Sequence, residues 1–311
     1  MRDESWLKAR LEEFQRDGVS PLGRIFEEES ISDVLNAVSQ SREFDSSLFL
    51  SREEFVANPE YTGVNPRPGR NFLEAIPAQL RTLESNTELE RFLVGLLGPE
   101  YHILDRKVVC GLPEVHLPHW IAQLVKGKSV NNLGCFVRPE LRDMTHFSGI
   151  YFQQELIDWR DRGPNFETLY IYLENVDAGD GPLVLLPKSH FLGASQFPHE
   201  LDLSIGEPRT WSYSSAERSL LCQESIFLGP SGSAAVWHAC LLHGTEPVAA
   251  DNPRLSLRYL IAAEDCNGAM LSRINASLLG DLSLHETRTD QSDSGEVVAM
   301  NNKLFEHRET E

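Results

Sequence analysis

The sequence predicts a mainly β fold, an antiparallel sandwich or barrel, preceded by a helical N-terminal segment. From about Tyr101 onwards, short β-like runs alternate with clusters of turn residues such as 179–181 (GDG) and 251–253 (DNP). Many short strands at regular spacing are typical of β-sandwiches and barrels. Before Tyr101, apolar residues recur at the spacing of three and four that is typical of amphipathic helices.

Four helices are expected in the N-terminal segment, at 5–16, 30–40, 72–85 and 87–98. Gly18 should stop the first helix, and Ser30 or Ser32 should cap the second. A Thr87–Glu90 capping box should open the fourth helix, and Gly98 should end it. Residues 46–70 hold three prolines with several glycines and asparagines, which predicts a loop.

Eight β-like runs follow, at 102–110, 121–127, 133–138, 149–156, 168–176, 182–187, 233–238 and 254–263. The last run alternates strictly: Arg254, Ser256 and Arg258 fall on one face of the strand. Leu255, Leu257 and Tyr259 fall on the other face. Polar residues on one side of a strand in a closed β structure indicate a barrel with a polar pocket.

We expect a single domain. Helices in residues 1–100 should pack on a β core formed by residues 101–265, and a C-terminal extension, 266–311, should be partly mobile around 286–297. The low hydrophobicity of that stretch supports the prediction of mobility.

The chain is acidic, with 28 Lys and Arg against 47 Asp and Glu and a formal net charge of −19. Such a charge disfavours nucleic acid or an anionic membrane surface as a partner and favours a small-molecule substrate. The five cysteines are scattered without a CxxC pair, so neither a disulfide framework nor a zinc ribbon is indicated. The opening is charged, and no apolar run reaches the roughly 20 residues that span a bilayer. We therefore expect a cytoplasmic protein, with its oligomeric state left open.

Three segments follow one another with the order and spacing of a mononuclear iron site: 149–159, 180–190 and 241–254. Non-haem iron is commonly bound by two histidines and one carboxylate, which leave an open face on the metal. Here Gln153 and Glu155 form the first pair of ligands, and His243 is the distal histidine. Arg254 lies eleven residues after His243, where it should anchor the distal carboxylate of 2-oxoglutarate. Thr245 should add a hydroxyl to the same carboxylate.

In these motifs the chain resembles the phytanoyl-CoA dioxygenase family of iron(II)/2-oxoglutarate oxygenases. The segment FQRDGVSPL (14–22) is similar to the opening of that family, and DGPLVLLPKSH (180–190) is similar to its strand–turn segment ending in Pro-Gly-Ser-His, with Lys188 in place of glycine. HGTEPVAADNPRLSLRYL (243–260) is similar to its distal His–Arg segment. The resemblance implies a double-stranded β-helix, a jelly-roll or cupin-like barrel. It also implies iron(II), 2-oxoglutarate, and hydroxylation or a related oxidation of a small molecule, with secondary metabolites favoured as the substrate class.

The chain departs from this family at YFQQELIDW (151–159), where the family has a His-Gln-Asp triplet. Glu155 preserves a carboxylate, but the amide of Gln153 is a much weaker iron ligand than an imidazole. His146 is the first candidate for a substitute ligand, and His116 with His119 is another. His190 and His238 are interpreted as structural histidines. Asp158, Trp159 and Arg160 are candidates for a substrate entrance.

Three functions are consistent with these residues. The first is an oxygenase in which Gln153, Glu155 and His243 hold iron, and Arg254 with Thr245 binds 2-oxoglutarate. The second is a non-oxidative isomerase or cyclase in which Glu155 and His243 act as an acid/base pair. The third is a catalytically inactive homologue that binds a small molecule or a partner protein.

Overall fold

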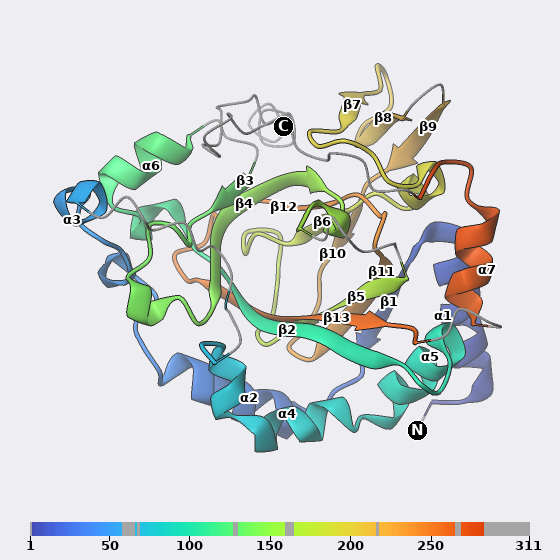
Figure 1. Cartoon of the computed structure of the whole chain (residues 1–311), viewed down its shortest axis with the longest axis horizontal. Helices are drawn as coiled ribbons and strands as arrows, with labels where there is room; N and C mark the ends of the chain where they lie inside the picture. Colours follow the sequence, from blue (N-terminus) through green and yellow to red (C-terminus); the bar gives the residue numbers. More distant parts are fainter. Residues whose placement is uncertain are drawn as a thin grey trace.

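A 10-stranded sheet, rolled into a nearly closed barrel, forms the centre of the computed structural model (Figure 1). Its strands run in the order β1-β11-β5-β13-β2-β4-β12-β6-β10, with β3 paired to β4. All neighbouring strands are antiparallel except β2 and β4. The bounds are β1 Val19–Arg24, β2 His102–Gly111, β3 Val130–Asn132, β4 Thr145–Gln153, β5 Phe166–Tyr172, β6 Leu183–Leu185, β10 Ser225–Phe227, β11 Ser233–His238, β12 His243–Thr245 and β13 Arg254–Ala262. The predicted fold class is confirmed.

The structure describes residues 2–57, 66, 69–126, 130–158, 165–215, 218–264 and 269–282. A separate three-stranded sheet comprises β7 (Glu200–Leu203), β8 (Thr210–Ser215) and β9 (Arg218–Gln223). Its aromatic side chains, Trp211 and Tyr213, pack in one cluster with Leu186 and Leu242 of the barrel. This small sheet therefore covers part of the outer surface of the barrel.

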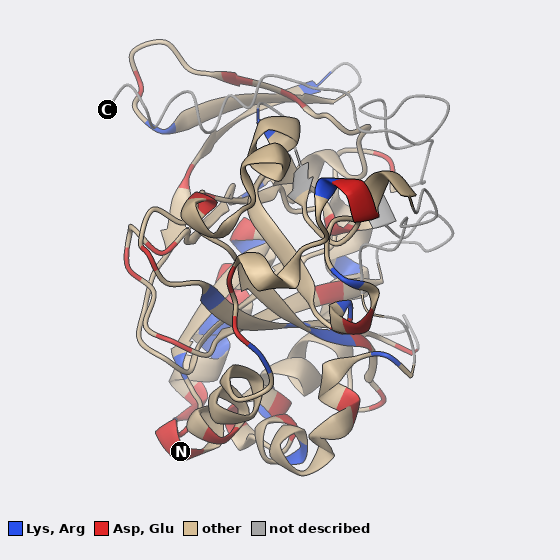
Figure 2. Ribbon diagram, turned by 90° about the vertical axis from the view of Figure 1, so that its left-hand side faces the viewer, with Lys and Arg blue, Asp and Glu red and all other residues tan. Residues whose placement is uncertain are grey.

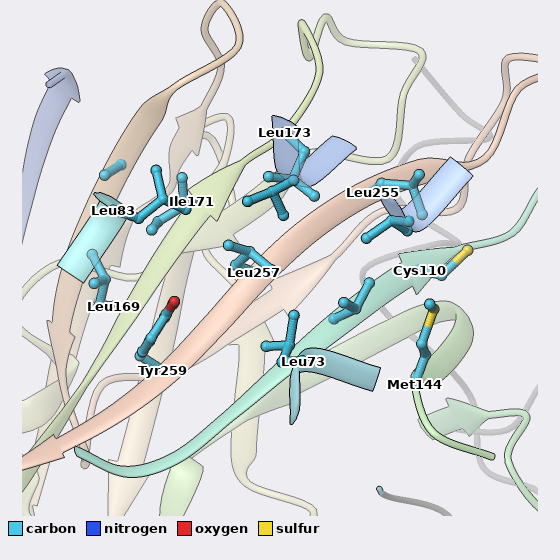
Figure 3. Close-up of a cluster of buried hydrophobic side chains, with 14 of the residues drawn as sticks. Leu73, Leu83, Cys110, Met144, Leu169, Ile171, Leu173, Leu255, Leu257 and Tyr259 are labelled. Atoms are coloured by element: carbon cyan, nitrogen blue, oxygen red, sulfur yellow. The ribbon is translucent and has the colours of Figure 1, made fainter. Parts of the chain in front are cut away.

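The helices are α1 Glu4–Asp17, α2 Glu28–Ser39, α3 Arg52–Ala57, α4 Pro77–Glu84, α5 Thr87–Leu97, α6 His119–Val125 and α7 Met270–Ser277. In the view of Figure 1, α2, α4 and α5 cover an outer face of the barrel below β2 and β13, whereas α1 and α7 lie at the right and α3 and α6 at the upper left. Short 3-10 turns occupy η1 Ser46–Leu48, η2 Phe72–Ala75, η3 Glu114–His116, η4 Pro139–Leu141, η5 Glu155–Asp158 and η6 Ser189–Leu192. Figure 3 shows leucines of β5 and β13 meeting Leu73 and Leu83 of the helical layer.

Alternation along the strands separates two cores. On β5, Leu169 and Ile171 join the helix-facing core, whereas Tyr170 and Tyr172 join a second cluster inside the barrel. On β13, Leu255, Leu257 and Tyr259 all face the helices. The alternation predicted for 254–259 is therefore confirmed on its apolar side, and its polar side is turned towards the barrel interior.

The predicted helix 5–16 is confirmed as α1, with Gly18 as a left-handed C-cap. The predicted end of α5 at Gly98 is also confirmed, but the predicted N-terminal caps of two helices are wrong. α2 begins after Glu27 without a side-chain cap, with acidic Glu28 and Glu29 in its first turn to favour the helix dipole. α5 is capped by Asn86, whose side chain accepts from Leu89 N–H, because asparagine serves this position as well as serine or threonine does.

Other helix boundaries also differ from the prediction. The expected helix 72–85 is split at Pro77, which fits only the first turn of a helix, into η2 and α4. The expected loop 46–70 contains η1 and α3, while 58–65 and 67–68 lie outside the described residues. The C-terminal stretch 286–297, predicted to be mobile, also lies outside them.

Two of the predicted strands are wrong. Residues 121–127 lie largely in α6, because Ile121 and Val125 bury one side of a helical turn. Residues 133–138 form turns with a single bridge, between Val137 and Phe49. Strand β1, from the segment expected to be helical, pairs with β11 and extends the sheet.

Charged residues are distributed over many elements rather than gathered in one block (Figure 2). Four cysteines, Cys110, Cys135, Cys222 and Cys240, are free thiols in the described part of the chain. Within those same residues, no helix is both long and apolar enough to cross a membrane.

Candidate active site

His243 and Gln153 face each other across two strands at the inner side of the barrel. They are direct partners in the antiparallel register of β12 and β4. Opposite residues in such a pair project from the same face of the sheet. The ring of His243 lies 5.0 Å from that of Trp237, a residue of the interior cluster. The structure therefore brings His243 and Gln153 to one side of the interior.

Glu155 lies just beyond the end of β4, in the first position of η5, and is buried. Its Oε2 atom lies 3.5 Å from Nε2 of His243 and accepts a 3.3 Å hydrogen bond from Thr168 Oγ1. Its Oε1 atom is ion-paired with the guanidinium of Arg258. Each oxygen of this carboxylate thus has a different partner.

The hydrogen bonds of His243 define its tautomer. Nδ1 lies 3.1 Å from the carbonyl oxygen of Leu241, which can only accept, so Nδ1 carries the proton. Burial lowers the pKa of His243 to about 4, so the ring is neutral at pH 7. Nε2 therefore presents a lone pair towards the carboxylate oxygen of Glu155. Two acceptors at this distance repel each other unless a cation or a proton lies between them.

The side chain of Gln154 holds the segment that carries Gln153 and Glu155 in place through hydrogen bonds to backbone groups. Its Nε2 donates to the carbonyls of Gly193, at 2.7 Å, and Cys240, at 2.9 Å. Its Oε1 accepts from the N–H of Ser195 at 3.0 Å. The buried amide therefore ties the end of β4 to the chain after η6 and to the chain before β12. All three segments singled out in the sequence meet at this side chain or next to it.

Arg254 is fully buried, yet its guanidinium is unpaired. It is 1% exposed, and Nε and both terminal nitrogens have no hydrogen-bond partner among the described residues. Three aromatic rings surround its Cζ atom at 5.4, 5.7 and 5.6 Å: Phe147, Tyr170 and Tyr172. The hydroxyl of Tyr172 is already engaged by Phe227 O and Leu183 N–H. All three guanidinium nitrogens of Arg254 can therefore donate hydrogen bonds to an anion, and the described residues provide no such acceptor.

Further donors in the same interior are also unused. Within the described residues, neither Trp237 Nε1 nor Ser256 Oγ, both buried, has a hydrogen-bond partner. Ser256 lies two residues after Arg254 on β13, and Trp237 belongs to the interior cluster. Thr245, buried on β12, lies opposite Leu183 of that cluster. Since buried polar groups are nearly always hydrogen-bonded, these unpaired donors indicate that the barrel interior takes a polar ligand.

The other histidines weighed from the sequence lie elsewhere. His146 is buried 6.4 Å, ring to ring, from Phe44 of the N-terminal segment. His116 Nε2 hydrogen-bonds Asp251 O at 2.7 Å. His190 packs 5.5 Å from His238, which bonds Asn275 of α7. For the proposed entrance, Asp158 ends η5, and Trp159 and Arg160 lie outside the described residues.

Sequence reasoning assigned no role to Arg258 and did not single out Thr168 or His199. Arg258 was detectable, because the strict alternation of 254–259 puts it on the same face as Arg254. Thr168 had no local signal, since its contact with Glu155 joins two separate elements, β5 and η5. His199 is buried, and its Nδ1 lies 2.7 Å from Ser195 Oγ, which also contacts the hydroxyl of Tyr213.

Comparison with solved structures identifies the fold. SnoN, described as a non-heme alpha ketoglutarate dependent epimerase from nogalamycin biosynthesis, superposes with a TM-score of 0.51 at 14% identity, over 95% of this chain and 99% of that one. The chain shares its fold with SnoN. A second SnoN structure, in complex with Fe3+, alpha ketoglutarate and nogalamycin RO, has a TM-score of 0.50 at 14% identity, over 94% of this chain and 98% of that one. The non-heme monooxygenase ThoJ matches at 0.49 and 12% identity, over 81% and 76% of the two chains.

No family model matches the chain, and no curated protein matches it in sequence. The phytanoyl-CoA dioxygenase assignment therefore stays a prediction.

The residues present fit a metal ion in part. Metal bonds to imidazole nitrogen and carboxylate oxygen are about 2.0–2.2 Å long. One ion can therefore bond both Nε2 of His243 and Oε2 of Glu155, which lie 3.5 Å apart. Gln153 offers an amide as a third donor. In the part of the chain that is described, no group of three His, Cys, Asp or Glu side chains is arranged to hold a metal. The site thus has two strong donors and one weak donor.

Proposed function

We propose that the protein is an enzyme of the iron/2-oxoglutarate fold that oxidises a small molecule, with a metal at His243, Glu155 and Gln153 and a 2-oxo acid at Arg254. The observation that carries this proposal is the unpaired guanidinium of Arg254. An unpaired charge buried away from water costs several kcal/mol, which a bound carboxylate offsets through charge-assisted hydrogen bonds. Phe147, Tyr170 and Tyr172 shape the space around that carboxylate.

The pair of His243 and Glu155 supports a metal in the same barrel interior. The carbonyl of Leu241 fixes the tautomer that leaves Nε2 free to coordinate, and the neighbouring carboxylate adds negative charge. Bound iron, with 2-oxoglutarate and dioxygen, supplies an oxidant for a substrate C–H bond. The chain's own contribution is to hold the oxo acid at Arg254 and to exclude water with the buried aromatic rings.

A second function is favoured by a specific observation. Glu155 already has a counter-ion in Arg258, and the third donor is an amide rather than an imidazole. Neutral His243 would then take a proton at Nε2 from a carboxylate substrate held by Arg254, and the adjacent Glu155 carboxylate would stabilise the imidazolium formed. The same imidazolium would return the proton to another atom of the substrate, without redox chemistry. Both functions require an anionic ligand at Arg254 and differ in their need for iron.

An anaerobic titration of metal-stripped protein with iron(II) and 2-oxoglutarate separates the two. The oxygenase proposal predicts a visible charge-transfer band that saturates and then bleaches when oxygen is admitted. The comparison variant is Gln153→His, which should bind iron more tightly on the same scaffold.

Each outcome has a clear meaning. A band in the wild-type protein supports the oxygenase. A band only in Gln153→His, together with 2-oxo acid binding by the wild type, would reject the oxygenase in favour of acid/base chemistry. If neither protein binds iron and Arg254 binds no carboxylate, both functions are wrong.

A further inference from the structure

The carboxylate of Glu155 is held from the side opposite His243. Arg258 NH1 is ion-paired with Oε1, while Oε2 faces His243 and Thr168. A glutamate has one more rotatable bond than an aspartate, so its carboxylate needs an additional contact to keep one orientation. In this site Arg258 supplies that contact.

Arg258 is itself fixed. Its second terminal nitrogen donates to Oδ2 of Asp105 on β2 at 2.8 Å, and its side chain is 11% exposed, compared with 32% for Asp105. The guanidinium therefore bridges a half-exposed carboxylate at the barrel wall and a buried carboxylate inside. Because guanidinium is planar, its two contacts fix the orientation of the Arg258 head group, which in turn fixes the position of Glu155 Oε1.

Arg258 and Arg254 lie on the same face of β13, four residues apart, but have opposite environments. Arg254 has no hydrogen-bond partner among the described residues, whereas Arg258 has two carboxylate partners. One strand thus supplies an arginine free to take a ligand and an arginine used within the protein. This division indicates different roles for the two residues.

We propose that Arg258, anchored by Asp105, is the positioning residue that turns Glu155 so that only Oε2 faces His243 and the carboxylate acts as a one-oxygen metal donor. This inference rests on the metal site of the proposed function. Partners that orient a metal ligand typically contribute about 10–100-fold to metal affinity. A competing effect has the opposite sign, because a guanidinium close to a metal ion repels it.

The test is calorimetric titration with iron(II) under anaerobic conditions, using wild type, Arg258→Met, Arg258→Lys and Asp105→Asn. The expected result is a Kd raised about 10–100-fold by Arg258→Met. Arg258→Lys should raise the Kd by less than Arg258→Met does but still above that of wild type, because an ammonium group keeps the charge but cannot bridge both carboxylates in one plane. Asp105→Asn should change the Kd in the same direction by a smaller factor. It also tests the role without removing the buried arginine, should Arg258→Met fail to fold.

Arg106→Met is the matched control. Arg106 lies on β2 next to Asp105, and its guanidinium is ion-paired with Glu84 at 2.6 Å, a residue of α4 on the helical side of the sheet. Its removal also deletes an arginine–glutamate pair but should leave the Kd for iron(II) unchanged. An unchanged or lowered Kd in both Arg258→Met and Asp105→Asn would overturn the proposal, since a purely repulsive arginine improves affinity when it is removed.

A crystal structure of metal-free Arg258→Met, or of Asp105→Asn, gives a second readout that does not depend on iron. The proposal expects the Glu155 carboxylate to turn away from His243. A carboxylate that keeps its place would overturn the positioning role. If the wild-type protein binds no iron(II), the proposed oxygenase fails, and this structural readout still decides what Arg258 does.

Discussion

At the scale of single residues, the barrel interior concentrates donors that the described residues leave unpaired, and Arg254 is the most costly of them. A buried charge without a partner carries a desolvation cost of several kcal/mol, which an apolar side chain of similar size does not have. We therefore expect Arg254→Met to raise the free energy of unfolding of the ligand-free protein while abolishing binding of 2-oxoglutarate.

Urea denaturation with and without 2-oxoglutarate measures both effects. Wild type should gain stability from the ligand, and Arg254→Met should not. The exposed Arg24, whose guanidinium pairs with Glu28 on the surface, is the control position, and Arg24→Met should change neither quantity. A large loss of stability in Arg254→Met would mean that the guanidinium has a structural role instead.

Lys188 shows a different residue-scale cost. Its backbone is left-handed, with φ of 74°, and its N–H donates to Asp17 O at 2.7 Å. A residue with a Cβ atom in this conformation loses about 1–2 kcal/mol of folding free energy. Glycine avoids this cost, but its greater conformational freedom in the unfolded chain offsets part of the gain. We expect Lys188→Gly to stabilise the protein by up to about 1 kcal/mol in urea denaturation. Lys188→Ala, which keeps the strained Cβ, should bring no such gain.

At the scale of elements, the site depends on how the end of β4 is joined to the rest of the barrel. Gln154 makes three hydrogen bonds to backbone groups there. In Gln154→Leu, two carbonyls and one N–H would lose their partners, at about 1–3 kcal/mol for each buried group. We expect a large loss of stability and, because Gln153 and Glu155 flank this residue, weaker iron(II) binding.

The measurements for Gln154→Leu are thermal unfolding and the iron titration. Gln123→Leu, the same substitution at an exposed position of α6, is the control and should change neither the unfolding temperature nor iron(II) binding. Iron binding that survives in a folded Gln154→Leu would mean that η5 and Arg258 hold Glu155 without this amide.

The elements also show how far the sequence alone leads. Long alternating or buried strands such as β5 and β13 were predicted, since their pattern reflects the two cores directly. α6 was not, because a short, mostly apolar run such as 121–125 is equally compatible with a strand. The cap of α5 was misplaced by one residue because Asn86 and Thr87 are both good caps.

The candidate site divides in the same way. Gln153, Glu155, His243 and Arg254 could be proposed as site residues because each lies in a local motif. The ion pair between Arg258 and Glu155 joins residues 103 positions apart, so no local spacing contains it. The unpaired state of Arg254 likewise depends on what its three-dimensional surroundings lack.

At the scale of the whole molecule, buried histidines should dominate the response of stability to acid. Burial lowers the pKa to about 3 in His146, His190 and His199, and to about 4 in His238. An unfolded histidine has a pKa of about 6.5. Between these values the unfolded chain binds protons that the folded protein does not. The contribution of these histidines to the free energy of unfolding therefore has its full value above about pH 6.5 and decreases as the pH falls towards 3–4.

Within this window, each such histidine increases the free energy of unfolding by about 1.4 kcal/mol for each unit by which the pH rises. His146→Phe should therefore reduce the slope of unfolding free energy against pH, measured in urea between pH 5 and 6, by about that amount. His116→Phe, at a half-buried position on the surface, is the control. An unchanged slope in His146→Phe would show that this histidine titrates normally in the folded protein.

Glu167 acts in the opposite direction over the whole fold. It is fully buried on β5, its carboxylate oxygens have no hydrogen-bond partner in the described residues, and burial raises its pKa well above the ordinary value. The folded state therefore holds a proton that the unfolded state releases above about pH 4.5, so this residue lowers stability as the pH rises towards its folded pKa.

Glu167→Gln keeps the shape without the ionisation and should raise the free energy of unfolding at pH 8. The gain should disappear near pH 4, where both states carry a neutral side chain. A gain that is the same at both pH values would assign the effect to packing, and no gain at pH 8 would mean that Glu167 is ionised and stabilised in the folded protein.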